Sequence, residues 1–204
     1  MSLELRQETL NHPHVPAERA ELFHSYDSAT TEDEYLHLLY SLVYCLKPRT
    51  VLETGSWQGV GSCFICRALK RNGVGRLTSI EKAPKVAEVA REQLRINQLD
   101  HISEVLTDDS IEYLSVTDKT FDFAFFDSLL PLRCLELNIC LDRGILQPGA
   151  FFAMHDTSRL RTVINGGGRD TQTEEYWREL LKINRINFLE FPFSRGLVLG
   201  QVQL

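Results

Sequence analysis

The chain has 204 residues, of which 43% are apolar and 25% charged, and its formal net charge is −6 at pH 7. This length suits one α/β domain, and the composition is that of a globular protein. No run of Lys or Arg is long enough to follow a phosphate backbone, and no stretch of 18 apolar residues or signal-peptide pattern occurs. We therefore expect a cytoplasmic protein that binds neither nucleic acid nor a membrane.

Residues 1–30 are polar and are expected to form an arm or helical lid, followed by a single domain over residues 31–204. Thr31 and Glu34 have the spacing of a capping box, and apolar residues at helical spacing follow them. This pattern predicts a helix that Pro48 ends.

Strands and helices alternate along the rest of the chain. The expected strands cover residues 50–54, 77–81, 102–106, 121–126, 150–154, 186–191 and 196–202. One helix is expected to end at about residue 71, a second to cover 85–97, a third to begin at 109 and a fourth to end near a turn at 147–149. A fifth is expected to begin at a second capping box, Thr171 with Glu174. The order predicts an α/β fold with a Rossmann-like, doubly wound, mostly parallel seven-stranded sheet, and the last two strands predict an antiparallel C-terminal hairpin. All five cysteines lie in apolar segments and are expected in the core.

Acidic residues follow most of the expected strands, at the edge where open α/β sheets bind their ligands. The residues at these ends are Glu53 to Gly55, Glu81, Asp108 and Asp109, Asp127, and His155 with Asp156. Six carboxylates on one edge would repel one another unless a cationic or polyhydroxylated ligand or a metal ion lies among them. The sequence therefore predicts a ligand site at this edge.

The loop after the first strand reads ETGSWQG over residues 53–59. A dinucleotide-binding fingerprint would need glycines where Trp57 and Val60 stand, and a P-loop would need a Lys followed by Ser or Thr, which this loop lacks. S-adenosylmethionine has no phosphate groups, and its sulfonium and amino groups suit an acidic pocket. It is therefore the expected cofactor.

Six segments carry a resemblance to a known family. In chain order they are VLETGSWQGVGSCFICRAL, SIEKAPKVAEVAREQL, DDSIEYL, FDFAFFDS, LQPGAFFAMHD and FPFSRGLVLGQV. Together they resemble the class I S-adenosylmethionine-dependent methyltransferases, and in particular the small-molecule O-methyltransferase branch with the caffeoyl-CoA and catechol enzymes. The resemblance implies direct methyl transfer to a small-molecule acceptor, with a hydroxyl oxygen as the expected acceptor atom.

The resemblance also assigns roles to the strand ends. Gly55, Ser56 and Gly59 would support the methionine part of the cofactor, with Glu53 fixing the loop and the cofactor amino group. Glu81 would hold both ribose hydroxyls, because a carboxylate offers two acceptor oxygens. Asp109 and Ser110 match the adenine position, although Asp109 alternatively only caps its helix.

Asp127 would face the reacting methyl group. In the members that need a divalent cation such as Mg²⁺, the positions of Asp127 and Asp156 bind the ion. Those members carry a Lys where this chain has Leu130 and an Asn where it has Thr157, so both metal dependence and a lysine base are open. His155 is a candidate general base, and a hydrogen-bonded structural residue is the alternative.

The walls of the acceptor pocket are expected from the N-terminal arm and the loop at 166–168, with Trp57, Phe152 and Trp177 as neighbours. Two other functions stay open at this point. One is a NAD-type Rossmann oxidoreductase, against which Trp57 argues, and the other is a non-catalytic cofactor-binding or regulatory domain. Homodimerisation is also left open.

Overall fold

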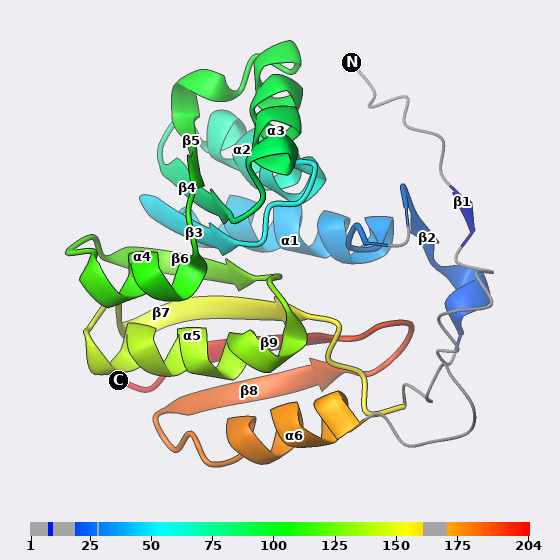
Figure 1. Ribbon diagram of the computed structural model, residues 1–204, viewed down its shortest axis with the longest axis vertical. Coiled ribbons are helices and arrows are strands. Elements are labelled where there is room, and N and C mark those ends of the chain that lie inside the picture. Colours follow the sequence, from blue (N-terminus) through cyan, green and yellow to red (C-terminus); the bar gives the residue numbers. More distant parts are fainter. Residues whose placement is uncertain (1–7, 10–18, 28, 161–170) are drawn as a thin grey trace.

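The computed structural model describes residues 8–9, 19–27, 29–160 and 171–204. At its centre is a seven-stranded sheet with the order β5-β4-β3-β6-β7-β9-β8 (Figure 1). Its strands are β3 (Thr50–Thr54), β4 (Arg76–Glu81), β5 (Ser103–Thr107), β6 (Phe121–Phe126), β7 (Leu146–His155), β8 (Ile186–Phe191) and β9 (Leu197–Val202). The pairs among β5, β4, β3, β6 and β7 are parallel, whereas β9 is antiparallel to both β7 and β8. The predicted sheet and its C-terminal hairpin are confirmed.

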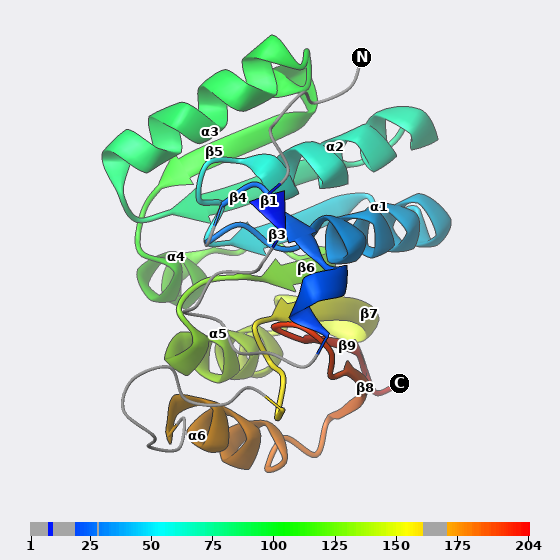
Figure 2. The same cartoon turned by 90° about the vertical axis from the view of Figure 1, so that its right-hand side faces the viewer.

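Helices cover both faces of the sheet, as Figure 2 shows from the side. They are α1 (Asp33–Leu46), α2 (Val60–Asn72), α3 (Pro84–Ile96), α4 (Ser110–Val116), α5 (Leu130–Asp142) and α6 (Thr171–Leu180). Apolar residues of α1, α2 and α3 form one core cluster with the sheet, and those of α4, α5 and α6 form the other. The fold is therefore doubly wound, as the sequence predicts.

Strand β6 shows how the sequence supplies both cores. Side chains alternate between the two faces of a strand. Phe123 and Phe125 accordingly pack in the core beside α1 to α3, while Ala124 and Phe126 pack in the core beside α4 to α6. A strand buried on both faces needs an apolar run such as residues 123–126, which stops at Asp127.

The strand order reverses at β3, which pairs with β4 on one side and with β6 on the other. Ligands of open α/β sheets bind outside the carboxyl ends of the strands at such a point. The backbone N–H of Asp127 donates to the carbonyl of Thr54 at 2.9 Å, so the two chain segments leaving β3 and β6 start side by side.

The described part of the N-terminal arm is a ribbon of two short strands, β1 (Glu8–Thr9) and β2 (His24–Ser25), with a 3-10 turn at Ala20–Leu22 between them. A second 3-10 turn, Asp100–Ile102, precedes β5. The predicted loop at 166–168 lies outside the described residues. Among the described helices, none has the length and apolar content needed to cross a bilayer.

Three local predictions are wrong. Thr31 does not cap α1, because its hydroxyl instead donates to Asp127 at 2.6 Å. The expected turn at 147–149 lies inside β7, where a register shift opposite β6 accommodates it. Cys45 is exposed, whereas the other four cysteines are buried.

Candidate active site

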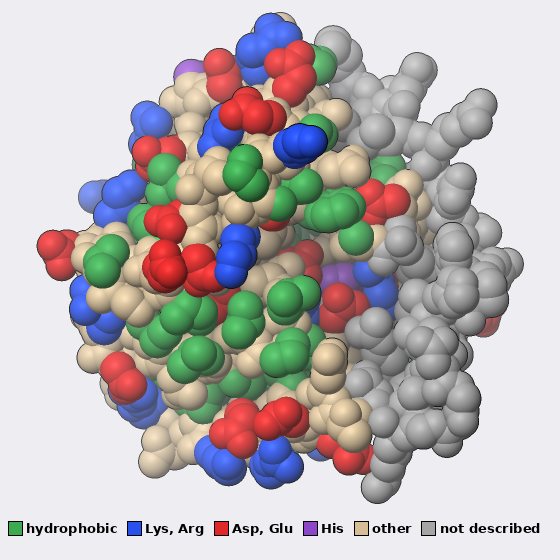
Figure 3. Space-filling view, viewed as in Figure 1, with side chains coloured by type: hydrophobic (Ala, Val, Ile, Leu, Met, Phe, Trp, Pro, Cys, Tyr) green, Lys and Arg blue, Asp and Glu red, His purple; other side chains and the backbone are tan. Residues whose placement is uncertain are grey.

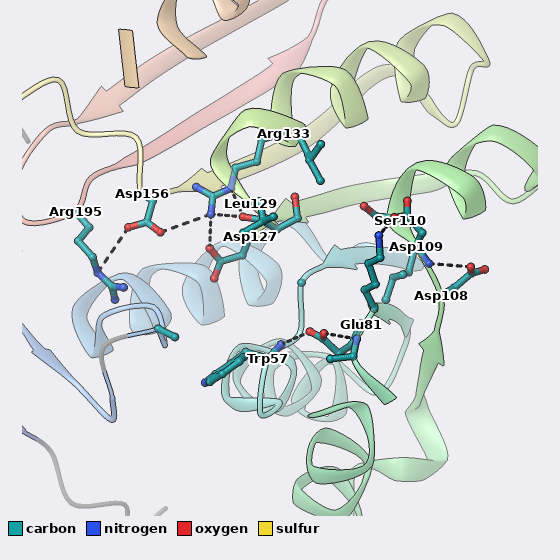
Figure 4. A pocket seen from close by; sticks show the side chains of 17 residues that line it. Trp57, Glu81, Asp108, Asp109, Ser110, Asp127, Leu129, Arg133, Asp156 and Arg195 are labelled. Carbon is teal, nitrogen blue, oxygen red and sulfur yellow. Dashed lines mark hydrogen bonds and ion pairs between the residues drawn. The ribbon is translucent and has the colours of Figure 1, made fainter. Parts of the chain in front are cut away.

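A cavity of about 580 Å³ opens at the carboxyl edge of the sheet (Figure 4). The space-filling view shows acidic and apolar side chains gathered around a hollow on this face (Figure 3). The predicted site residues that line the cavity are Gly55, Glu81, Asp109, Ser110, Asp127 and Asp156. The structure thus brings the ends of five parallel strands to one cavity.

Glu81, at the end of β4, is held in place by the backbone. One of its carboxylate oxygens accepts from the N–H of Trp57 at 3.0 Å, and the other accepts from the N–H of Ala83 at 2.9 Å. Each carboxylate oxygen has a second lone pair. The carboxylate is therefore fixed in orientation and retains one acceptor position on each oxygen for a ligand with two adjacent hydroxyl groups.

The glycines of the first loop have different tasks. Gly55 has φ +77°, and a Cβ there would lie 2.5 Å from the carbonyl oxygen of Asp127, so only glycine fits this close approach. A Cβ on Gly59 would lie 2.8 Å from the Cα of Ala90, so this glycine packs against α3 and does not line the cavity. A Cβ on Gly61, which the sequence reasoning did not single out, would meet Glu53 at 2.9 Å.

Glu53 is buried beneath the loop and does not line the main cavity. Its carboxylate accepts hydrogen bonds from the hydroxyls of Ser62 and Ser79. Burial raises the pKa of Glu53 to about 7, although these two hydrogen bonds oppose the rise. Glu53 therefore joins the start of α2 to β4 behind the loop.

A second, small cavity lies between this loop and the segment that enters α1. Glu53, Gly55, Ser56 and Asp127 are among its lining residues. The hydroxyl of Ser56 is buried there and has no hydrogen-bond partner among the described residues. A buried hydroxyl without a partner is costly, so this corner suits a polar ligand group.

Asp109 and Ser110 begin α4 at the other end of the main cavity. Asp109 caps the helix by accepting from the backbone N–H of Ile111 at 2.8 Å, and it pairs with Lys82 at 2.7 Å. The capping alternative for Asp109 is therefore real, even though the residue also lines the cavity. Ser110 donates its hydroxyl to Glu136 of α5 at 2.5 Å.

His155 is fully buried between two carboxylates. Its Nε2 pairs with Glu32, at the entrance to α1, and its Nδ1 lies 3.1 Å from Asp127. Burial alone would lower the pKa of His155, but the negative charges of Glu32, Asp156 and Asp127 outweigh burial and raise it. Because both ring nitrogens face carboxylates and the residue does not line the cavity, this geometry favours the structural alternative over a general base.

Two arginines that the sequence reasoning missed complete the charged cluster. Arg133, from the first turn of α5, lies 3.2 Å from Asp127 and 3.6 Å from Asp156. Arg195, from the loop before β9, lies 3.8 Å from Asp156 and 3.2 Å from Glu32. Both arginines are buried and line the cavity (Figure 4).

Asp127 and Asp156, the candidate ligands of a divalent cation, are therefore already paired with arginines. Asp127, His155 and Asp156 each offer an atom within 4.8 Å of the others, which is close enough for a shared ion. However, Mg²⁺ binds oxygens at about 2.0–2.1 Å in an octahedral array. Arg133 lies against the same carboxylates, so a divalent cation does not fit this arrangement.

Of the three aromatic residues expected beside the acceptor pocket, one lines the cavity and two are buried in the core. Trp57 lines the cavity, and its indole N–H donates to Asp27 at 3.0 Å. Phe152 and Trp177 are instead buried in the core beside α4 to α6. Leu130 is buried in the same core, and Thr157 is also fully buried.

A family described as "Methyltransferase domain" matches residues 52–157, just over half of the chain. This stretch contains the strand ends from β3 to β7 that meet at the cavity. The chain belongs to this methyltransferase-domain family. No curated protein matches the sequence.

Solved structures share the fold at low sequence identity. The S-adenosylhomocysteine-bound methyltransferase PaMTH1 of Podospora anserina is similar with a TM-score of 0.75 and 15% identity, over 86% of this chain and 81% of that one. An O-methyltransferase of Bacillus cereus in complex with S-adenosylhomocysteine has a TM-score of 0.72 and 21% identity, over 87% and 84%. The O-methyltransferase TomG of Streptomyces achromogenes, in complex with S-adenosylmethionine, has a TM-score of 0.69 and 20% identity, over 86% and 82%.

Proposed function

We propose that this chain is an S-adenosylmethionine-dependent methyltransferase that transfers a methyl group to a hydroxyl oxygen of a small molecule. The observation that carries the proposal is the carboxylate of Glu81, fixed by two backbone N–H groups at the end of β4 and facing a cavity of about 580 Å³. Membership of the methyltransferase-domain family supports the reaction class. The cofactors bound by the similar solved structures support the choice of ligand.

We propose that the part of the cavity near Glu81 and α4 binds the cofactor. Glu81 would accept from both ribose hydroxyls, and Asp109 with Ser110 would border the adenine. Gly55 leaves room for close approach to the backbone, and the hydroxyl of Ser56, which has no partner among the described residues, suits a polar group of the methionine part. Neither Gly59 nor Glu53 lines the main cavity, so we assign neither of them a direct contact with the ribose or adenine.

When bound, S-adenosylmethionine supplies a methyl group on a sulfonium, so that a C–O bond forms to the acceptor as the C–S bond breaks, and the hydroxyl proton leaves. The residues of the chain supply position and charge. Holding two reactants in line can contribute roughly 7–11 kcal/mol in favourable cases.

We place the acceptor in the other part of the main cavity, around Asp127, and call this part the acceptor half. Asp127 lines both cavities, and its carboxylate accepts hydrogen bonds from Thr31 and Arg133. We assign it the hydroxyl of the acceptor, whose proton it would accept. Leu129 and Leu132 line the cavity beside it, which favours an acceptor with an apolar body next to its hydroxyl group.

The test is methyl transfer itself. The chain is incubated with S-adenosylmethionine and a panel of phenols, catechols, aliphatic alcohols, amines and thiols, and methylated product is measured by mass spectrometry. A methyl ether formed from a phenol or catechol supports the proposal, and Asp127→Asn should slow its formation by roughly 10²-fold or more. Product from an amine or thiol alone would contradict the choice of oxygen. Binding of S-adenosylhomocysteine without product from any acceptor class would instead favour a non-catalytic cofactor-binding domain.

A further inference from the structure

Arg133 occupies the space between the two carboxylates of the acceptor half. Its Nη2 lies 3.2 Å from Oδ1 of Asp127 and 3.6 Å from Oδ2 of Asp156, and Figure 4 shows the guanidinium between them. The side chain is almost fully buried yet belongs to the cavity lining. The positively charged guanidinium of Arg133 therefore already occupies the space between these two carboxylates.

The guanidinium is fixed by the backbone as well as by the acids. Its Nε donates to the carbonyl of Ser128 at 2.9 Å and its Nη2 to the same carbonyl at 2.6 Å. Its Nη1 donates to the carbonyl of His155. Because the fork of donors is planar and rigid, these bonds set the position of the charge without relying on the two acids.

The surrounding charges fit a built-in cation. Arg195 lies on the far side of Asp156, 3.8 Å from Oδ1, so both oxygens of that carboxylate face guanidinium groups. His155 faces Oδ1 of Asp127 from the side of β7. An added divalent ion would meet the two guanidinium groups at close range in a buried site, where repulsion is poorly screened.

We propose that Arg133 takes the place of a divalent cation in this chain, holding Asp127 and Asp156 in position and supplying the fixed positive charge beside the acceptor. This inference rests on the proposed methyl transfer for its purpose, but its geometry is independent of the acceptor. Arg133 acts as a positioning residue. The reaction therefore needs no metal ion, and removing the guanidinium exposes an acidic pair able to bind one.

The first experiment measures Mn²⁺ binding by electron paramagnetic resonance, with Mn²⁺ alone as the probe. Wild type should leave Mn²⁺ free. Arg133→Met, which keeps an unbranched apolar stem and removes the guanidinium and its charge, should bind Mn²⁺, and adding Asp127→Asn to it should abolish that binding. Arg133→Lys keeps a charge and should exclude the ion. Arg143→Met is the matched control, because Arg143 is a partly exposed arginine at the other end of α5 that pairs with Asp118.

Two Mn²⁺-binding results would overturn the inference. One is Mn²⁺ binding by wild type that Asp127→Asn removes, and the other is a folded Arg133→Met variant that binds no Mn²⁺. If Arg133→Met does not fold, the wild-type measurement decides together with turnover in EDTA, which should change by less than about twofold. A strong loss of turnover in EDTA that Mg²⁺ restores would also contradict the proposal.

Titration of S-adenosylhomocysteine on the same samples separates this inference from the proposed function. Wild type that binds neither Mn²⁺ nor S-adenosylhomocysteine would contradict the methyltransferase proposal, whereas the Mn²⁺ comparison between Arg133→Met and Arg133→Lys would still test the role of the guanidinium.

Discussion

Glu136 accepts a hydrogen bond from the hydroxyl of Thr54 at 3.0 Å, although 82 residues separate the two in the chain. The same buried carboxylate accepts from Ser110 at 2.5 Å and from Ser128 at 2.8 Å. Thr54 ends β3, Ser110 begins α4 and Ser128 follows β6, so one side chain of α5 joins three segments at the cavity. Burial raises the pKa of Glu136, against the effect of these three hydrogen bonds.

Replacing this carboxylate should therefore loosen the cavity. Glu136→Ala leaves three hydroxyls without their acceptor, and we expect it to weaken S-adenosylhomocysteine binding about tenfold and to destabilise the fold by about 2–4 kcal/mol. Glu136→Gln keeps one acceptor oxygen and should recover part of both losses. Calorimetry and urea unfolding measure the two effects, with exposed Glu112→Ala as the control. Equal, unchanged affinities in all three variants would show that Glu136 does not position the cavity.

Gly55 allows the loop after β3 to touch the backbone at Asp127. Gly55→Ala should distort this contact, because its Cβ would lie 2.5 Å from a carbonyl oxygen. Gly73→Ala is a matched control, since Gly73 has a similar φ of +68° and a methyl group added there would have no other atom within 4 Å. Both variants should lose about 1–2 kcal/mol from positive φ. Only Gly55→Ala should lose more and also lose cofactor binding, and equal losses in unfolding experiments would refute a close approach at Gly55.

Glu53 predicts a pH dependence of stability. Its pKa is raised from 4.5 to about 7 in the fold, mainly by burial, so between these values the folded chain binds more protons than the unfolded chain. The free energy of unfolding should therefore fall as pH rises through this window, and the loss should be complete above pH 7. Glu53→Gln removes this dependence.

The measurement is urea unfolding of wild type and Glu53→Gln at several pH values. Other titrating groups are common to both chains, so the difference in stability between them isolates Glu53. We expect that difference to move by about 3 kcal/mol in favour of Glu53→Gln between acidic and neutral pH, given about 1.4 kcal/mol per pKa unit. A stability difference that does not change with pH would show that burial does not raise the pKa of Glu53.

A substitution at His155 tests whether this residue is structural or acts as the general base. As a buried partner of Glu32 and Asp127, it should tolerate His155→Gln with a turnover loss below about tenfold and a stability loss of about 1–3 kcal/mol. A general base would instead lose roughly 10²–10⁴-fold in turnover. A large turnover loss with unchanged thermal stability and unchanged cofactor affinity would instead support His155 as the general base.

The strand ends could be predicted from the sequence because an acidic residue follows or ends most of the strand patterns, most clearly after the apolar residues 123–126 of β6. Asp127 ends the run of β6 and Glu81 ends β4, and parallel strands bring such positions to one edge. Gly59 belongs to the same glycine-containing loop as Gly55, but it packs against α3. This packing depends on where α3 lies, which no local sequence pattern specifies.

The missed residues lie on α5 and near the ends of the domain. Arg133 and Glu136 share the buried face of a helix with Leu137 and Cys140. Two charged residues on an otherwise apolar helix face are a sequence signal for buried ion pairs or hydrogen bonds. Glu32 and Arg195 are 163 residues apart and form a pair only through tertiary folding.

The most direct test of the cofactor site is calorimetric titration of S-adenosylhomocysteine and of NAD into wild type and Glu81→Ala, with Glu88→Ala on α3 as an exposed control. We predict binding of S-adenosylhomocysteine with about micromolar Kd by wild type and by Glu88→Ala, no heat with NAD, and a loss of about tenfold or more in Glu81→Ala. Binding of NAD without S-adenosylhomocysteine, or full affinity in Glu81→Ala, would contradict the cofactor site proposed for this cavity.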